Sequence, residues 1–420
     1  MSCVILQVGQ CGNQIGECFW NRVDELNEPG YVFKQYDGYY RSVAVDTEPK
    51  VLKGFCNTRR TGGITFRNEN VIMDRSGRGN NWAFGYYGRK NESEEKNIFG
   101  RTMRAMRKEI ERCDSYCGTL LIHSLSGGTG SGVGSRLLEL LRDEYPLNYI
   151  VSCAVAPFST GESPLQNYNS LLSLSALSRL SDGIIMFSND DVLWRLKKRS
   201  RSQAVDEPPV VSLSDINQHI AACLCGLIAP VDSLTPKAGV SIGMEPWEML
   251  QSLCPMPSHK FLHVNSVSRK NVLWENMTSS LVRSLNRRNH TDGSTFSSLA
   301  NLVVARGDQE QQFPAVMNCI ENQLKSAYQT VKWNPFPVDF WVSSKETGQP
   351  TAKSLTVGSN YSNIIPQLEA MLQSSRTKLE ARAYLHWYEK YGCTREDFLE
   401  AFDNIQTVVD AYKDATCENQ

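Results

Sequence analysis

The stretch from Gly118 to Gly132 combines residue types and spacing that could bind a phosphate group. An apolar, strand-like run ends at Leu125, a glycine-rich sequence fills 126–132, and 133–142 has the pattern of a helix. A turn between a strand and a helix points backbone N–H groups at a phosphate, and the helix N-terminus adds partial positive charge. Glycines suit such a turn because a Cβ would block both a close approach and a positive φ.

This turn differs from the two common nucleotide fingerprints. No Gly-Lys-Ser/Thr follows it, so no lysine would reach the terminal phosphates as in a P-loop. The spacing of Gly127, Gly128, Gly130, Gly132 and Gly134 does not fit G-x-G-x-x-G, which disfavours a dinucleotide-dependent oxidoreductase. A glycine-rich turn by itself is more often an ordinary loop, so its place between a strand and a helix is what favours phosphate binding.

Two further turns near the N-terminus contain glycine and asparagine. The strand-like Val4–Val8 is followed by a predicted turn, Gly9–Gln14, and then by a helical pattern over 15–26. The sequence 77–82 is another such turn. Strand–turn–helix units repeated in this way are typical of a doubly wound parallel sheet, which binds nucleotides at the carboxyl ends of its strands.

Carboxylates follow another short apolar run. The sequence 43–45 is strand-like and ends in Asp46-Thr47-Glu48-Pro49. Oxygen ligands beside a phosphate site would suit Mg²⁺, which prefers them and keeps several waters. In isolation the same sequence would be a solvated turn.

The order of patterns predicts an α/β fold. Strands and helices alternate to about residue 200, which indicates a mainly parallel sheet. The helical pattern over 215–229 is apolar nearly all round, as in a buried helix. We therefore expect a nucleotide-binding parallel sheet flanked by helices (1–208), a central buried helix (209–230), a mixed α/β domain (231–365) and a C-terminal helical hairpin (366–420), with its helices over 364–391 and 394–413.

Composition narrows the functional classes. A net charge of −1 argues against a general nucleic-acid binder, and no apolar run approaches the length of a membrane span. The 13 cysteines lack zinc spacing, and the first residues form a strand-like start without a basic n-region. We expect reduced cytosolic thiols and no partner among membranes or nucleic acids.

Several motifs together resemble the tubulins. The sequences 126–132 and 9–16 match the family's nucleotide loops, and 45–49, 79–83 and 385–388 look like further landmarks. Their order and spacing hold along nearly the whole chain. The resemblance implies a cytoskeletal protein that binds GTP or GDP with Mg²⁺ and contacts other tubulins head to tail.

The resemblance also implies roles for individual residues. Gly128, Thr129 and Gly130 would cradle the phosphates, with Ser124 nearby and Gln10 and Cys11 closing the other side. Gly79 and Asn80 would lie at the terminal phosphate, and Glu48 with Asp46 would serve Mg²⁺ through water. Asn189 and Asn217 would read guanine, and Glu162 would lie near the ribose. An Asn side chain suits guanine because it offers both a donor and an acceptor.

Two positions bear on base stacking and on catalysis. Leu213 stands where the family has a tyrosine that stacks on the base, which predicts weaker stacking. Glu248 stands where alpha-type tubulins carry the glutamate that activates water on the neighbouring subunit's GTP. We predict that Glu248 is catalytic in trans as a water-orienting base; the alternative is a surface helix carboxylate.

Other differences point to a divergent subclass. The segment Asn265–Asn271 would replace the lateral-contact loop of microtubule tubulins in a shorter form, and the sequence ends without a glutamate-rich tail. The pattern is most similar to the tubulins of centrioles and basal bodies, zeta first and delta or epsilon next. We expect a structural component of cytoplasmic centrioles, basal bodies or cilia with centriolar partners, the alternative being a pseudo-GTPase structural module.

Overall fold

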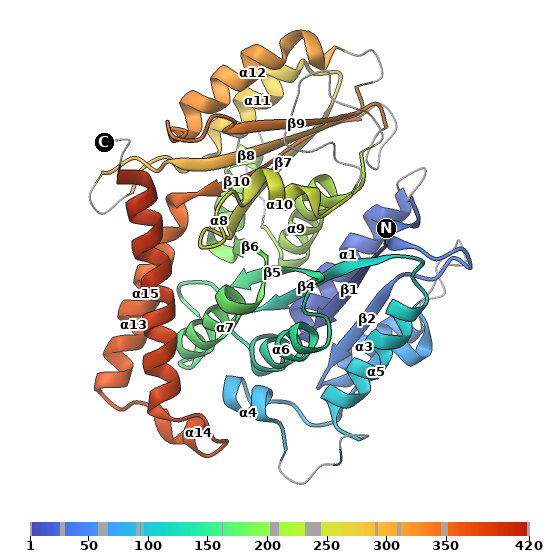
Figure 1. Cartoon of the computed structure of the whole chain (residues 1–420), viewed down its shortest axis with the longest axis vertical. Coiled ribbons are helices and arrows are strands. Elements are labelled where there is room, and N and C mark those ends of the chain that lie inside the picture. Colours follow the sequence, from blue (N-terminus) through green and yellow to red (C-terminus); the bar gives the residue numbers. More distant parts are fainter. Residues whose placement is uncertain are drawn as a thin grey trace. The chain divides into compact units, whose positions relative to one another are not determined.

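The computed structural model describes residues 2–25, 30–57, 66–89, 93, 96–161, 163–201, 210–231, 245–289, 293–308, 312–345 and 352–417 (Figure 1). It divides into two compact units. Unit 1 comprises Met1–Glu17, Gly30–Ile184 and Leu368–Val408, and unit 2 comprises Cys18–Pro29, Ile185–Gln367 and Val409–Gln420. The domain limits predicted from the sequence stay predictions.

The sheet of unit 1 is parallel and fully buried at its centre. Its strands are β1 (Ser2–Val8), β2 (Ser42–Asp46), β3 (Val71–Met73), β4 (Tyr116–Ser124) and β5 (Tyr149–Ala156), in the order β3-β2-β1-β4-β5. All neighbouring pairs are parallel, as predicted. The chain proceeds to one side of β1 through β2 and β3, and to the other side through β4 and β5. The point between β1 and β4 is therefore the switch point at which such sheets bind ligands.

Helices follow most strands of unit 1. They are α1 (Gly9–Glu25, its start in unit 1), α2 (Gly30–Phe33), α3 (Pro49–Asn57), α4 (Trp82–Tyr87), α5 (Ile98–Glu111), α6 (Gly134–Glu144) and α7 (Gln166–Leu180). The predicted turn Gly9–Gln14 was wrong in extent, because α1 begins at Gly9 itself and only Gly9 has a positive φ, 75°. A glycine in the left-handed region lets the chain turn from strand to helix within one residue.

The C-terminal segment forms a helical hairpin that is interrupted once. Its helices are α13 (Ile365–Glu380), α14 (Leu385–Glu389) and α15 (Arg395–Cys417) (Figure 1). The Arg376 guanidinium of α13 lies over the Phe402 ring of α15 at 5.6 Å. The single helix predicted over 364–391 was wrong. Arg382 and Tyr384 have positive φ values of 51° and 62°, which end α13 and start α14.

Unit 2 contains a mixed sheet and a central helix. Its strands β7 (Phe261–Lys270), β8 (Ser298–Arg306), β9 (Val338–Ser343) and β10 (Ala352–Tyr361) lie in the order β7-β10-β8-β9. Strand β10 is antiparallel to β7 and β8, whereas β8 and β9 are parallel. The helices are α8 (Asn189–Arg201), α9 (Leu213–Ile228), α10 (Glu248–Leu253), α11 (Trp274–Arg283) and α12 (Phe313–Tyr328); β6 (Gly183–Ser188) crosses the unit boundary.

Helix α9 is the buried helix that the sequence predicts. A capping box starts it, in which the Ser212 hydroxyl accepts from the Asp215 N–H and the Asp215 carboxylate accepts from the Ser212 N–H. Ten of its residues are buried, from Ile216 to Ile228. Among the described helices, none has the length and apolar character needed to cross a bilayer.

The predicted lateral-contact segment Asn265–Asn271 was wrong as a loop. Residues 265–270 belong to β7, where they pair in register with 352–357 of β10. The connection from β7 to α11 is therefore only 271–273. Pairing with β10 extends the strand through this segment, so its serines and basic residues did not mark the strand end.

Candidate nucleotide site

Two glycine turns of unit 1 meet at the switch point. The β1 turn (Gly9–Gly12) starts α1, and the β4 turn (Gly127–Gly132) follows β4 and includes a wide helical turn over Gly128–Val133. A Cβ on Gly9 would lie 3.0 Å from the Gly130 nitrogen and 3.2 Å from its Cα. Such a contact would crowd a side chain at Gly9, so the two turns form one backbone surface beside the carboxyl ends of β1 and β4.

Neighbouring side chains hold the β1 turn. The buried Asn13 amide donates to the Gly9 carbonyl at 2.9 Å and to the Val45 carbonyl of β2 at 3.0 Å. Gln10 is exposed, and Cys11 is half-buried with its pKa raised to about 12 by burial. Its thiol therefore stays protonated at neutral pH and is a neutral lining group rather than a nucleophile.

Side chains of Ser124 and Thr47 pack against the β4 turn and hold it in place. Ser124 packs under Gly130, where a Cβ would lie 2.5 Å from the serine Oγ. The hydroxyls of Thr129 and Thr47 are 2.5 Å apart, which links the β4 turn to the segment after β2. Gly127 offers no side-chain cap, so the first N–H groups of this helical turn have neither an intrahelical acceptor nor a capping side chain. Such a helix start suits an anion.

His123 supports the β4 turn and gives the site a pH dependence. Its buried Nδ1–H donates to the Gly130 carbonyl at 3.0 Å, and burial lowers its pKa from 6.5 to about 4. The folded chain keeps this ring neutral below pH 6.5 while the unfolded chain takes up a proton, so the free energy of unfolding falls as pH falls from about 6.5 to 4.

We expect this loss to reach roughly 3 kcal/mol at pH 4. Thermal unfolding at pH 7 and pH 4.5 would measure it, with His123→Asn as the variant that keeps an N–H donor but does not titrate. The decrease in melting temperature should be smaller in the variant. An equal decrease in both proteins would contradict the role assigned to His123.

A third turn lies against the second. The β3 turn (77–82) follows β3, and Gly79 and Asn80 within it have positive φ values of 54° and 51°. A Cβ on Gly128 would lie 2.6 Å from the Arg78 carbonyl oxygen, whereas one on Gly79 would meet nothing within 4 Å. Gly79 therefore faces open space at the place expected for the terminal phosphate.

The sequence analysis missed Asn169, which joins the β3 and β4 turns. This buried residue of α7 donates from Nδ2 to the carbonyls of Asn80 and Ser126, both at 2.7 Å. Its Oδ1 accepts from the Trp82 N–H at 2.9 Å and from the Tyr388 hydroxyl of α14 at 2.7 Å. The signal available in the sequence was an asparagine within the leucine-rich pattern of this helix.

The expected metal ligands lie beside the same turns. Asp46 ends β2 and is 3% exposed, and its Oδ2 is buried without a hydrogen-bond partner. Burial, together with the nearby Glu48, raises the pKa of Asp46 to about 6. Glu48 is half-buried against Gly77, whose Cβ would lie 2.7 Å from the Glu48 Oε1. An unpartnered buried carboxylate oxygen next to a second carboxylate fits a hard cation.

This pair is not a complete metal cage. The described residues contain no cluster of three or more His, Cys, Asp or Glu side chains that could hold a metal ion. Mg²⁺ commonly takes one or two carboxylates and fills its remaining positions with water and substrate phosphate oxygens. The donor set therefore fits Mg²⁺ brought together with a nucleotide.

The expected guanine-reading residues belong to unit 2. Asn189 is the first residue of α8 and Asn217 lies in α9; both are half-buried. Leu213 is the first residue of α9 and is 62% exposed. Glu162, expected near the ribose, lies outside the described residues.

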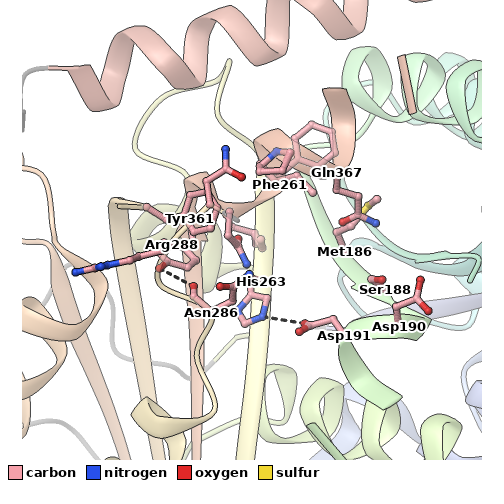
Figure 2. Close-up of a pocket in the computed structure, with 16 residues that line it drawn as sticks. Met186, Ser188, Asp190, Asp191, Phe261, His263, Asn286, Arg288, Tyr361 and Gln367 are labelled. Carbon is pink, nitrogen blue, oxygen red and sulfur yellow. Dashed lines mark hydrogen bonds and ion pairs between the residues drawn. The ribbon is translucent and has the colours of Figure 1, made fainter. Parts of the chain in front are cut away.

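A partly buried ion-pair cluster anchors the start of α8. Arg195 donates to Asp191 at 2.6 Å and also to the His263 ring nitrogen. Asp191 and His263 line a cavity of about 340 Å³ in unit 2, where Figure 2 shows them facing each other. Although burial opposes it, the Arg195 charge holds the pKa of Asp191 at about 2. These contacts tie α8 to β7 and so fix the position of Asn189 within unit 2.

Glu248, the expected catalytic residue, starts α10 and is half-buried. Its Oε1 accepts from the Glu245 backbone N–H at 3.1 Å. In the same short helix, the Ser252 hydroxyl donates to Asp339 of β9 at 2.7 Å. The carboxylate is thus held on a helix that is itself tied to the sheet of unit 2.

The parallel sheet, the switch point and the glycine turns form a backbone surface suited to a phosphate without a P-loop lysine. Residues 2–195 match the family model described as "Tubulin/FtsZ family, GTPase domain". Over nearly its whole length the chain is also similar to tubulins.

The similarity extends to several tubulin types. The chain is 28% identical to the tubulin delta chain of Macaca fascicularis over 473 residues, covering 98% of this chain and 99% of that protein. It is 28% identical to the Homo sapiens tubulin delta chain over 475 residues, with the same coverage of 98% and 99%. It is 29% identical to the tubulin beta-2 chain of Suillus bovinus over 452 residues, covering 99% and 97%.

Proposed function

We propose that this tubulin-like cytoskeletal protein binds GTP at the switch point of unit 1, mainly through peptide N–H groups of the β1, β3 and β4 turns. The observation that carries the proposal is the close contact of Gly9 with Gly130, in which a Cβ would lie only 3.0 Å from the Gly130 nitrogen, so that the two turns make one backbone surface. Backbone amides at a helix start bind anionic phosphates without a lysine.

The proposed site assigns separate tasks to its residues. Gly128, Thr129 and Gly130 orient the phosphates, with Ser124 behind them and Gln10 and Cys11 closing the opposite side. Gly79 and Asn80 reach the terminal phosphate. Asn189 and Asn217 read the guanine edge, and Glu162 is assigned to the ribose.

Asp46 and Glu48 would hold Mg²⁺ through water. When bound, this cation neutralises phosphate charge. The unpartnered Oδ2 of Asp46 supports this assignment, because a buried carboxylate oxygen without a donor is costly unless a cation compensates it.

Hydrolysis would be completed in trans by a neighbouring tubulin. Glu248 of one subunit would orient water against the terminal phosphate held by the next subunit and accept the proton that the attacking water loses. This arrangement requires a head-to-tail contact, which repeats to form an open filament. The hydrogen bond that Glu248 accepts from the Glu245 N–H supports this role, because it holds the carboxylate in one orientation.

We further propose that the protein acts at centrioles, basal bodies or associated microtubules, together with their components. The similarity to tubulin delta chains supports the divergent class. Within this class, zeta is our first assignment and delta or epsilon the next. Localisation of the tagged chain in ciliated cells tests the assignment, and a uniform cytosolic signal would contradict it.

Nucleotide extraction tests the binding proposal. Purified protein is denatured and the released small molecules are separated by chromatography. GDP or GTP in a ratio near one per chain supports the proposal, and an empty site or NAD contradicts it. Sedimentation with GTP, alone and with alpha or beta tubulin, then tests assembly.

A second candidate function is a structural module that does not hydrolyse GTP. The observation favouring it is Leu213, an exposed aliphatic side chain where the resemblance implies a stacking tyrosine. Loss of base stacking lowers nucleotide affinity, although the backbone phosphate site does not depend on it.

We expect Leu213→Tyr to tighten GDP binding by up to about tenfold, because an aromatic stack contributes about 0.5–1.5 kcal/mol. Fluorescence titration with a labelled GDP analogue measures the change. Leu273→Tyr is a matched control, since Leu273 is also 62% exposed and directly precedes α11. If both substitutions leave the affinity unchanged, Leu213 does not face the base.

A further inference from the structure

A second cavity of unit 2 has an unbalanced charge. It has a volume of about 450 Å³ and is lined by residues of α8, α9, β7 and α11 and by Ser284 after α11. Its basic side chains are Arg195 and Lys198 from α8, Arg269 from β7 and Arg283 from α11. No aspartate or glutamate is among its described lining residues.

Most of this charge is not compensated within the described chain. Arg195 forms the ion pair with Asp191, which removes it from the balance. Lys198, Arg269 and Arg283 form no ion pair with a described carboxylate, and all three side chains are exposed at the cavity. Lys198 Nζ instead donates to the backbone carbonyl of Arg283 at 3.0 Å. Three cations are therefore gathered from three elements, and their mutual repulsion would be relieved by an anion.

Neutral hydrogen-bond donors line the same cavity. Asn276, Ser280 and Arg283 are spaced by four and three residues on α11, so they share one face of the helix. Asn276 and Ser280 have no side-chain hydrogen bond to any described residue. In contrast, Asn265 and Ser284 bind each other at 2.8 Å and form the wall. Open amide and hydroxyl donors beside guanidinium groups match the oxygens of a phosphate.

We propose that this cavity binds a small ligand carrying two or more phosphate groups. Two guanidinium groups and one ammonium can neutralise a multiply charged anion, and the arginine forks suit the tetrahedral oxygens of phosphate. The cavity volume exceeds what a single phosphate fills, which leaves room for a second phosphate or for the body of the ligand. The site lies entirely in unit 2 and shares no residue with the proposed GTP site.

Calorimetry with inorganic pyrophosphate as the probe tests the proposal. The full chain is first saturated with GDP and Mg²⁺, or used as purified if no nucleotide binds, so that the glycine turns cannot account for the signal. We expect one pyrophosphate per chain and an affinity that falls with salt. The double variant Arg269→Ser/Arg283→Ser should weaken binding by at least about 100-fold, corresponding to roughly tenfold for each lost charge-assisted contact.

A charge-matched control accompanies it. Lys332→Ser/Lys345→Ser removes two positive charges of unit 2 that do not line the cavity and should bind pyrophosphate as the unchanged chain does. Equal weakening in both double variants, or no pyrophosphate binding by the unchanged chain, would overturn the proposal. GDP binding measured in parallel reports folding, and it should be the same in all variants.

Two further probes identify the source of the phosphate. Vesicles of phosphatidylcholine containing phosphatidylinositol 4,5-bisphosphate present the same chemistry on a lipid, and their binding, lost in the Arg269→Ser/Arg283→Ser variant, would support the site with a headgroup as its ligand. A tetraglutamate peptide presents carboxylates instead. If the peptide binds through these arginines and pyrophosphate does not, the phosphate assignment is wrong.

Discussion

Replacing Gly9 by alanine is expected to lower the affinity of the chain for GDP by at least about 100-fold, or roughly 2.7 kcal/mol. The new Cβ would lie 3.0 Å from the Gly130 nitrogen, so the β1 and β4 turns must separate by a few tenths of an ångström. The amides that converge on the phosphates would then be displaced from one another, and preorganised donors lose much of their effect when displaced. Calorimetric titration of nucleotide-free protein with GDP and Mg²⁺ measures the loss.

Gly293→Ala separates crowding from backbone strain. Gly293 has a φ of 74°, close to the 75° of Gly9, but a Cβ there would meet nothing within 4 Å. Both substitutions therefore carry the cost of about 1–2 kcal/mol for a non-glycine residue in the left-handed region. Only Gly9→Ala should lose nucleotide. Retention of GDP by both variants, with similar melting temperatures, would show that the two turns do not form the binding surface.

Replacing Glu248 by alanine is expected to lower GTP turnover in assembled protein by about 10²–10⁴-fold, the usual contribution of a positioned general base. Binding of GTP by the same subunit should not change, because the proposed role of Glu248 is at a neighbour's nucleotide. Phosphate release measured in sedimented assemblies reports turnover, and extracted nucleotide reports binding. The conservative variant Glu248→Gln can still accept the hydrogen bond from the Glu245 N–H but cannot take a proton.

The two variants should therefore share the loss of turnover while differing in the stability of α10. Glu275→Gln provides the control, since Glu275 is likewise an acidic residue in the first turn of a unit 2 helix. Mixing experiments add a second test: a subunit lacking Glu248 but holding GTP should turn over normally when its neighbour retains the glutamate. Turnover unaffected by Glu248→Ala in a pure assembly would leave the residue as a surface helix carboxylate.

Much of the fold followed from patterns that act locally. The alternation of apolar strands with glycine turns and helices predicted the parallel sheet of unit 1, and the all-round apolar sequence of α9 predicted its burial. These features depend on side-chain periodicity within a short window, which a sequence displays directly. The parallel order also explains why the β1 and β4 turns meet, since both follow adjacent strands.

Features without a local signal were missed. The break between α13 and α14 uses positive φ at Arg382 and Tyr384, positions where no glycine or asparagine announces a turn. The end of β7 at Lys270 is set by its pairing with β10, which lies far along the chain. Asn169 joins segments that are distant in sequence, so its importance emerges only when the turns are brought together.

The hydrogen bonds around Asn169 connect the β3 and β4 turns to the surface of unit 1. The Tyr388 hydroxyl of α14 donates to this amide, and the neighbouring Trp387 carbonyl accepts from the Asn81 side chain of the β3 turn at 3.0 Å. The Trp387 indole itself is 48% exposed. We therefore expect a shift of the β3 turn to reach this solvent-exposed indole, whose fluorescence would then respond to the conformation of the turn.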